Sequence, residues 1–267
     1  MKLYTLIENT TCDDSLACEH GLSLYIEVSG QRILFDAGQT GAFADNAEKM
    51  GVDLTQVDLC ILSHGHYDHG GGIKRFLEVN DHAKVYVSQH AFGDYYNAEE
   101  KYIGLDWELL SEERIVFVRD NLTLSDTLSL HTCPNFPQVY ATSAYGMQAK
   151  RRDQMETDDF RHEMYLLIRE GERRIVVSGC SHRGVMNLKT WFAPDVFIGG
   201  FHLMKLDPEK EATRLKFTAM ELLKQETVYY TGHCTGDAQY AMLKDVMGER
   251  LHRLSTGSFL DTDGLID

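Results

Sequence analysis

Short apolar runs interrupted by turn residues fill the first third of the chain and predict β-strands. They cover residues 3–7, 22–28 and 33–35, and the last two are separated by a short polar segment around Gly30, which is typical of a hairpin. Residues 59–62 are apolar throughout, as in a strand that is buried on both faces. The pattern therefore predicts a sheet in this part of the chain.

Helical spacing, in which apolar residues recur every three or four positions, occurs in both halves of the chain. The expected helices are residues 42–50, 70–79, 208–225 and 238–247, and the later strands are 164–168, 174–177, 196–198 and 228–230. Sheets in both halves with helices outside them predict an α/β fold, specifically a four-layer αββα sandwich.

A single domain over residues 1–267 is expected, because the four prolines are scattered and no low-complexity linker is visible. The segment near residues 91–111 breaks the regular pattern. Its aromatic residues are Phe92, Tyr95, Tyr96, Tyr102 and Trp107. It predicts a helical or lid-like insertion near the site, with a peripheral hydrophobic cluster as the equal alternative.

The charge balance argues against a nucleic-acid partner. With 26 Lys and Arg against 41 Asp and Glu, the formal net charge is −15, whereas a protein that binds a nucleic-acid backbone needs a basic surface. A small anionic substrate is still allowed, because bound divalent cations would offset negative charge locally. No apolar run is long enough to cross a membrane. The lack of a signal-peptide core and of paired CxxC cysteines favours a reducing cytoplasm.

The strongest chemical signal follows the apolar run at residues 59–62. His64, His66, Asp68 and His69 fall within six residues, directly before three glycines. Imidazole and carboxylate ligands together suit zinc, iron or manganese. The glycines let the loop turn sharply and let its backbone approach an ion. The spacing therefore predicts a metal site.

His64, His66, Asp68 and His69 match the HxHxDH signature, and by it the chain resembles the metallo-β-lactamase superfamily. The match extends in order over nearly the whole chain. The resemblance implies that Asp36 orients the metal loop without binding metal, which suits ligating imidazoles because their second nitrogen needs an acceptor. It also implies that His233, after the strand at 228–230, is a metal ligand.

The third and fourth motifs of the superfamily are less clear in this chain. The third-motif histidine is predicted as His162, with His131 as the rival. Where the superfamily has an aspartate as the fourth-motif ligand, this chain has Cys180, followed two residues later by His182. The expected ligand is His182, with Cys180 as its neighbour or a weak ligand, although Cys180 also fits a small buried apolar position.

Three further segments narrow the resemblance to one group within the superfamily. Residues 179–184, 199–203 and 232–236 read GCSHRG, GGFHL and GHCTG. Together with the residues around Glu8 and Glu19, they are similar to the dihydropterin-ribofuranosyl-aminobenzene-phosphate synthase-like group. That group is broad, so its name does not identify the reaction of this protein.

Several polar residues are candidates for substrate contact. His202 follows a buried strand and is predicted to face the substrate, and Arg183 is predicted to bind an anion near a helix start. The remaining candidates are Glu8, Asn9, Glu19 and His20. Ordinary polar surface is the alternative for each of them.

The sequence and the resemblance together predict a hydrolase with two divalent metal ions, zinc first, with iron or manganese as alternatives. The substrate is expected to be a small, anionic phosphoester, cyclic phosphate, ester or lactone. The catalytic candidates are Asp68 and His202, and the predicted metal ligands are His64, His66, Asp68, His69, His162, His182 and His233. A di-iron redox protein and a non-catalytic metabolite-binding protein are the alternatives, and the oligomeric state is open.

Overall fold

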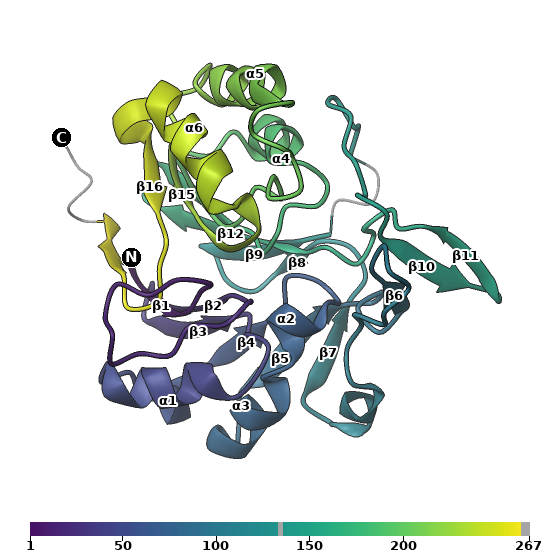
Figure 1. Ribbon diagram of the computed structural model, residues 1–267. Coiled ribbons are helices and arrows are strands. Elements are labelled where there is room, and N and C mark those ends of the chain that lie inside the picture. The colour runs from purple at the N-terminus through teal and green to yellow at the C-terminus, as the bar shows by residue number, and fades with distance from the viewer. Residues whose placement is uncertain (133–135, 263–267) are drawn as a thin grey trace. The chain divides into compact units, whose positions relative to one another are not determined.

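The computed structural model describes residues 1–132 and 136–262. Contacts divide the chain into two compact units. Unit 1 comprises Met1–Arg119, Gly146–Met164 and the residues from Ser255 onward, and unit 2 comprises Asp120–Tyr145 and Tyr165–Leu254. Each unit contains one large sheet with its own helices (Figure 1). The expectation of a single domain stays a prediction.

Unit 1 is built on a seven-stranded sheet in the order β17-β1-β2-β3-β4-β5-β7. The strands are β1 (Lys2–Ile7), β2 (Ser23–Val28), β3 (Gln31–Phe35), β4 (Leu59–Ile61), β5 (Lys84–Ser88), β7 (Ile115–Val118) and β17 (Phe259–Asp261). The pairs from β17 to β3 are antiparallel, and those from β3 to β7 are parallel. The predicted strands of the first third are therefore confirmed.

The hairpin between β2 and β3 has the geometry that its sequence predicts. Val28 pairs with Gln31, so Ser29 and Gly30 form a two-residue loop, and both have positive φ, 51° and 76°. Two positive φ angles define the type I′ turn, whose twist matches that of the adjoining strands.

Helices α1 (Ala42–Lys49) and α3 (Ile73–Val79) pack on the sheet of unit 1. Phe43 and Phe76 from these helices share a buried cluster with Leu34 and Val85 from the strands. Phe35, on the opposite face of β3, is also fully buried. Both faces of the central strands thus exclude water, as their continuous apolar sequence predicts.

The helix that we expected at residues 70–79 is divided in two. The short helix α2 (Tyr67–Gly70) ends before Gly71 and Gly72, and α3 starts at Ile73. A Cβ atom at Gly72 would lie 2.1 Å from the carbonyl oxygen of Ala37. The close approach of the chain to the end of β3 therefore divides the helix and requires glycine.

The segment near residues 91–111 has no α-helix. It contains β6 (Asp94–Tyr96) and the 3-10 helix η2 (Trp107–Ser111), and β6 joins β10 (Gln148–Arg151) and β11 (Gln154–Thr157) in a small sheet. Leu105 and Leu109 are buried in the core of unit 1. The helical character of the segment is thus limited to η2, and its role as a lid stays a prediction.

Unit 2 is built on a second seven-stranded sheet, in the order β16-β15-β14-β13-β12-β9-β8. The strands are β8 (Leu122–Thr123), β9 (Leu128–His131), β12 (Tyr165–Glu170), β13 (Arg173–Val177), β14 (Val196–Ile198), β15 (Val228–Thr231) and β16 (Leu251–Arg253). The strands from β13 to β16 are parallel, and β12 pairs with β13 in an antiparallel hairpin.

Helices α4 (Val185–Phe192), α5 (Ala212–Leu222) and α6 (Asp237–Met247) cover the sheet of unit 2 (Figure 1). Helix α5 starts four residues later than the predicted start at residue 208. The carboxylate of Asp207 accepts hydrogen bonds from the amides of Glu209 and Lys210, and these bonds hold a separate turn before the helix. None of the helices in the described part of the chain is long and apolar enough to span a bilayer.

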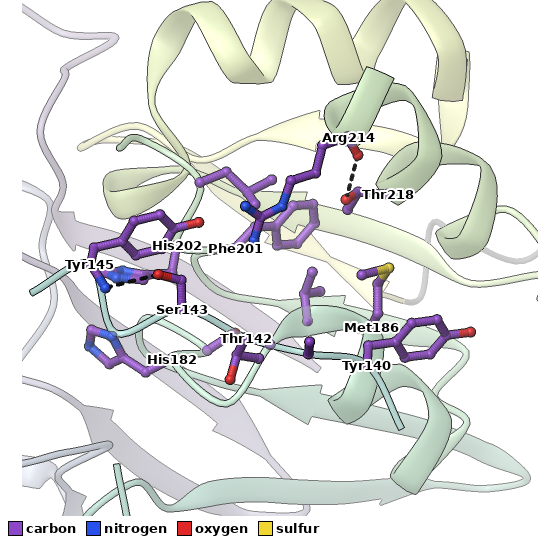
Figure 2. A pocket seen from close by; sticks show the side chains of 15 residues that line it. Tyr140, Thr142, Ser143, Tyr145, His182, Met186, Phe201, His202, Arg214 and Thr218 are labelled. Carbon is purple, nitrogen blue, oxygen red and sulfur yellow. Dashed lines mark hydrogen bonds between the residues drawn. The ribbon is translucent and has the colours of Figure 1, made fainter. Parts of the chain in front are cut away.

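The chemistry-bearing loops follow the carboxyl ends of parallel strands, which meet at one edge of a sheet. In unit 1, Asp36 follows β3 and His64 comes shortly after β4. In unit 2, the loops after β13 and β14 both contribute residues to one pocket (Figure 2). Sheet topology therefore gathers residues that are far apart in the chain.

Removing the buried amide of Asn80 should destabilise unit 1. Its Nδ2 donates to the carbonyl oxygens of Leu54 and Val57, at 3.0 Å each, and its Oδ1 accepts from the amide of Ala83 at 2.7 Å. Asn80→Ala leaves buried backbone groups unpaired, so we expect the free energy of unfolding to fall by about 1–3 kcal/mol. Denaturant unfolding measures this, with Asp81→Ala as an exposed control. Equal midpoints for the two variants would contradict the assignment.

Candidate metal centre

The metal-binding motif of unit 1 forms a compact group of buried polar side chains. The ring centroids of His64 and His66 are 4.6 Å apart, and those of His64 and His69 are 4.2 Å apart. His69 Nε2 lies 3.8 Å from the Asp68 carboxylate. All four residues are at most 8% exposed. Burying so many polar groups is unfavourable unless they have partners, and a bound cation would provide one.

Asp36 holds this loop in place from the end of β3. Its Oδ1 accepts a hydrogen bond from the Ser63 amide, and its Oδ2 accepts from the Ser63 hydroxyl and from His69 Nδ1, each at 2.7 Å. Because Nδ1 of His69 donates to a carboxylate, a metal ion would be bound through Nε2, which lies on the side of Asp68. These contacts support the predicted orienting role of Asp36.

A glycine is required between the two histidines of the loop. A Cβ atom at Gly65 would lie 2.1 Å from the carbonyl oxygen of Ala91. This separation is far below van der Waals contact, so any side chain at this position would displace the loop.

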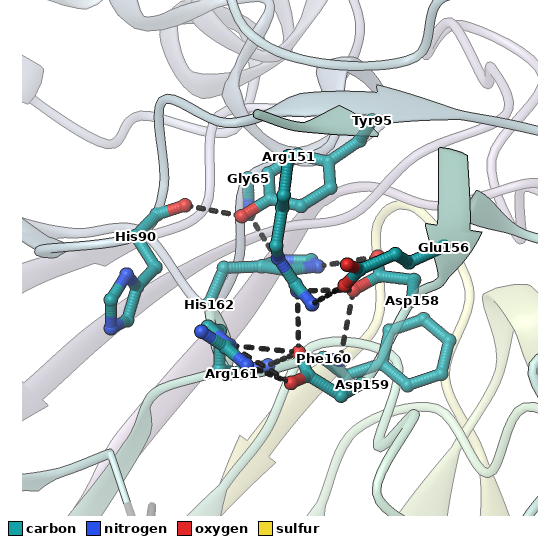
Figure 3. Close-up of polar contacts among 10 residues, drawn as sticks. All are labelled: Gly65, His90, Tyr95, Arg151, Glu156, Asp158, Asp159, Phe160, Arg161 and His162. Carbon is teal, nitrogen blue, oxygen red and sulfur yellow. Dashed lines mark hydrogen bonds and ion pairs between the residues drawn. The ribbon is translucent and has the colours of Figure 1, made fainter. Parts of the chain in front are cut away.

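His162 has hydrogen bonds at both ring nitrogens (Figure 3). Its Nδ1 accepts from the Gly65 amide at 3.0 Å, and its Nε2 donates to Asp158 Oδ2, also at 3.0 Å. His162 thus shapes the metal loop directly, and binding an ion through Nε2 would require it to exchange the Asp158 contact. Its assignment as a ligand stays a prediction.

Asp158 is a buried residue of this group that sequence reasoning missed. Donor atoms of His66, Asp158 and His162 lie within 4.8 Å of one another, a spacing that a metal ion can bridge. The only signal in the sequence is an acid four residues before a histidine, a pattern too common to single out. Long-range folding brings both residues to the loop at residues 63–66.

Neighbouring carboxylates partly neutralise the basic residues 150–152. The Asp159 carboxylate pairs with Arg161 and, at 2.7 Å, with Arg151 (Figure 3). Burial alone would raise the pKa of Asp159, but hydrogen bonds from these two guanidinium groups outweigh it and lower the pKa to about 2. Arg151 is therefore engaged in ion pairs within unit 1.

His66 is neutral at physiological pH. Burial, reinforced by the electrostatic influence of the neighbouring His162, lowers the pKa of His66 to about 3. A neutral imidazole has the lone pair that a metal ion requires, so this histidine needs no deprotonation before binding.

The residues predicted in the N-terminal segment fall into two groups. His20 Nε2 lies 3.4 Å from Asp68 Oδ2, and Asn9 contacts His20 at 3.3 Å. Glu8 instead accepts hydrogen bonds from Thr10, and Glu19 accepts them from the amides of residues 39 and 40. His20 is thus placed beside the metal motif, with Asn9 next to it, and the role of all four residues in substrate binding stays a prediction.

In unit 2, the three loops after β13, β14 and β15 bring a second polar group together. Cys180, His202 and Cys234 offer donor atoms within 4.8 Å of one another, and the rings of His182 and His202 are 4.1 Å apart. His202 and His233 have φ angles of 53° and 49°. Left-handed backbone is strained for histidine and is concentrated at functional sites.

The pKa of the Cys234 thiol is perturbed by its surroundings in these loops. Burial raises its pKa, but hydrogen bonding with Cys180 and His202 and the charges of His233 and His202 outweigh burial, so the net pKa is well below the usual value. A thiol in this environment gives up its proton readily.

Beside these loops lies a pocket with an empty volume of about 480 Å³, which includes the solvent space at its opening (Figure 2). Tyr145, Phe201 and His202 line it, and α5 contributes Arg214. The predicted anion-binding residue Arg183 is not part of its lining, because its guanidinium lies 5.2 Å from the ring of Trp191. Arg214 was missed because a single arginine on a helix gives no signal in the sequence.

His131, the rival third-motif histidine, lies in unit 2. It ends β9, its Nε2 contacts the Ser129 hydroxyl at 2.8 Å, and its ring packs edge-on against Phe192 with centroids 5.5 Å apart. These contacts are typical of a structural histidine.

Comparison with known proteins identifies the family. The family model "Metallo-beta-lactamase superfamily" matches residues 17–135. An uncharacterized protein of Methanocaldococcus jannaschii is 31% identical over 209 residues, which are 74% of this chain and 78% of that protein. The chain belongs to the metallo-β-lactamase superfamily. The recognition made from HxHxDH is therefore confirmed.

Other relatives extend the likeness over the full length. The M. jannaschii protein named 7,8-dihydropterin-6-methyl-4-(β-D-ribofuranosyl)-aminobenzene-5′-phosphate synthase is 28% identical over 97% of this chain and 96% of its own. Among solved structures, Tm1679, described as a metal-dependent hydrolase of the β-lactamase superfamily, has a TM-score of 0.82 and 24% identity, covering 98% of both chains. Zn²⁺-bound PqqB from Methylobacterium extorquens has a TM-score of 0.62 and 11% identity, covering 98% of this chain and 100% of its own. These two structures confirm the predicted α/β fold of the superfamily.

Substitution of Asp36 tests its positioning role. Asp36→Ala should weaken zinc affinity by about 10–100-fold, because His69 loses the acceptor that fixes its ring. Competition with a chromophoric chelator measures the affinity, and thermal unfolding of metal-free protein separates it from a loss of fold. Asp81→Ala is the exposed control. Unchanged zinc affinity in folded Asp36→Ala would show that the carboxylate serves the fold alone.

A paired substitution tests the third-motif assignment. His162→Ala should lose one metal equivalent, whereas His131→Ala should retain the full complement, measured by elemental mass spectrometry after dialysis. The reverse result would assign the role to His131. Near-ultraviolet circular dichroism checks that both variants keep their tertiary packing.

Proposed function

We propose that the protein is a binuclear, metal-dependent hydrolase that acts on a small, anionic substrate, either a phosphoester or cyclic phosphate or an ester or lactone. The observation that carries this proposal is the buried group of His64, His66, Asp68 and His69, which Asp36 orients. Superfamily membership supports metal dependence, and the likeness to Tm1679 supports the fold.

The donor set fits divalent metal ions. Three imidazoles and a carboxylate converge in unit 1, which suits zinc first and iron or manganese as alternatives. We assign His64, His66 and His162 to one ion and Asp68 and His69 to the other. His182 and His233 stay predicted metal ligands on the strength of their sequence motifs.

A bound pair of divalent ions supplies Lewis acidity towards a carbonyl or phosphoryl oxygen and lowers the pKa of water. The protein supplies the acid–base groups. The Asp68 carboxylate accepts a proton from the attacking water. His20, whose Nε2 is 3.4 Å from that carboxylate and whose side chain is 47% exposed, can transfer the proton to solvent.

A pocket within unit 2 is proposed to bind a small anion. His202 lines this pocket and is proposed to contact the substrate there, as a positioning or proton-transfer group. Arg214 provides the positive charge that an anionic substrate requires, in a chain whose net charge is −15.

A second candidate is a bond-forming reaction on the same metal centre. The full-length relative named as a synthase favours it, at 28% identity. Product analysis separates the two, because hydrolysis incorporates oxygen from ¹⁸O-labelled water into the product and condensation does not.

Metal content and one variant test the main proposal. Protein purified without added metal should contain about two equivalents of divalent metal. Asp68→Ala should lower kcat on a confirmed substrate by about 10²–10⁴-fold, because it removes the proton acceptor. Steady-state kinetics measures this, with Glu78→Ala as an exposed acidic control. A wild-type rate in Asp68→Ala, or protein that takes up neither zinc, iron nor manganese, would overturn the proposal.

A further inference from the structure

The loops after β13, β14 and β15 bring His202, which we proposed as a substrate contact, together with two cysteines that have no role in the proposed hydrolase. Ligand atoms of Cys180, His202 and Cys234 lie within 4.8 Å of one another. All three residues belong to unit 2, and neither cysteine forms a disulfide with another described residue. The group is therefore a donor set that one unit assembles by itself.

The two cysteines of this group are buried, and the ring nitrogens of its histidine lack hydrogen bonds of normal geometry. Cys180 and Cys234 are 3% and 2% exposed. Both ring nitrogens of His202 are inaccessible to solvent, and among the described residues neither has a hydrogen-bond partner of normal geometry. Buried imidazole nitrogens without partners are unfavourable, so this arrangement points to a ligand that the histidine binds.

The backbone is shaped to admit the second thiol. A Cβ atom at Gly200 would lie 2.3 Å from the Cys234 sulfur, so only glycine leaves space for that sulfur beside β14. The same loop places His202 at a φ angle of 53°. Without a metal ion, the Cys234 thiol donates weakly to the carbonyl oxygen of Cys180 at 3.4 Å.

The spacing and the donor type suit one soft metal ion. Zinc–sulfur bonds are about 2.3 Å long, so two sulfurs on a tetrahedral zinc ion are about 3.8 Å apart. The three ligand atoms lie within 4.8 Å of one another, so small side-chain rotations are enough to complete the site. Thiolates favour zinc or copper(I) over magnesium or manganese.

We propose that Cys180, His202 and Cys234 form a second type of metal site, a Cys2His site for one thiophilic ion, with zinc as the first choice. Binding releases the two thiol protons to solvent and makes two metal–sulfur bonds and one metal–nitrogen bond. This goes beyond the proposed hydrolase centre, which uses imidazole and carboxylate ligands, and it does not depend on that centre being catalytic.

The proposed site has an open coordination position. Three protein ligands with one exchangeable position are typical of reactive zinc sites, whereas structural sites have four protein ligands. His202 also lines the pocket of unit 2, so a small molecule in that pocket can approach the ion (Figure 2). The fourth ligand is therefore expected to be water or a group of a bound small molecule.

Cobalt substitution tests the proposal on the full chain. Metal-free protein is titrated with Co²⁺ under reducing, anaerobic conditions, and the near-ultraviolet band for charge transfer from thiolate to cobalt is recorded. We expect a saturable band at one equivalent per chain. Cys180→Ser and Cys234→Ser should each lose about half of its intensity per bound ion, since intensity follows the number of metal–sulfur bonds, and the double variant should lose all of it.

Two controls make the assignment specific. Cys60→Ser removes a buried thiol of unit 1 and should leave the band unchanged. His202→Ala should keep both sulfur bonds but weaken cobalt binding by at least tenfold. A wild-type protein without the band would overturn the proposal, and so would full intensity in Cys234→Ser, which would mean that Cys180 binds metal without its partners.

A second measurement covers variants that fail to fold. In the wild-type protein, saturation with zinc should protect both Cys180 and Cys234 from maleimide labelling in peptide mass spectrometry, while the exposed Cys12 and Cys18 stay reactive. Labelling of Cys234 in zinc-saturated protein at the metal-free rate would overturn the site. Asp68→Ala separates the two proposals, because it should abolish hydrolysis and retain the cobalt–thiolate band.

Discussion

The carboxylate of Asp36 is the contact on which the candidate metal centre depends. It is almost fully buried and accepts three hydrogen bonds, two from Ser63 and one from His69. A buried carboxylate with this number of donors is satisfied, whereas one that lost them would be strongly destabilising. Two adjacent parallel strands, β3 and β4, are thus joined at their carboxyl ends by a side chain that also sets the orientation of a histidine ring.

From this anchor the rest of the loop is built by close backbone packing. Gly65 lies against the carbonyl oxygen of Ala91, and its amide donates to His162, which in turn donates to Asp158. The imidazoles therefore have little freedom, and preorganised ligands of this kind lose little entropy when they bind an ion. Asp68, for which we propose a role in proton transfer, lies next to the exposed His20 at the edge of this rigid group.

The two units differ in the ligand chemistry they offer. Unit 1 presents imidazoles and carboxylates, which accept zinc, iron and manganese, whereas the loops of unit 2 add two thiols beside a strained histidine. The left-handed backbone at Asp36, His202 and His233 follows a strand end in each case, with φ between 49° and 60°. Such conformations persist only where the surrounding structure enforces them, and all three positions hold groups with a proposed role in metal chemistry.

The sequence alone determined the elements and the compact motif. Alternating apolar runs marked the strands, and HxHxDH marked the metal loop, because its ligands lie within one short segment whose spacing is visible in one dimension. The resemblance to the superfamily also made it possible to expect Asp36, which follows β3, the strand adjacent to β4.

Tertiary structure decided what depends on distant contacts. His162 contacts Gly65 across 97 positions of the sequence, and Cys234 contacts Cys180 across 54. No local pattern of apolar and polar residues can predict contacts between residues so far apart in the sequence. The pairing of Asp158 with His162, the position of Arg214 in the pocket and the thiol group of unit 2 belong to this class. Local sequence fixes which strand or turn a residue enters, because that choice depends on neighbouring residues. The partner of a buried polar group is set by the order in which strands pair, which only the folded chain defines.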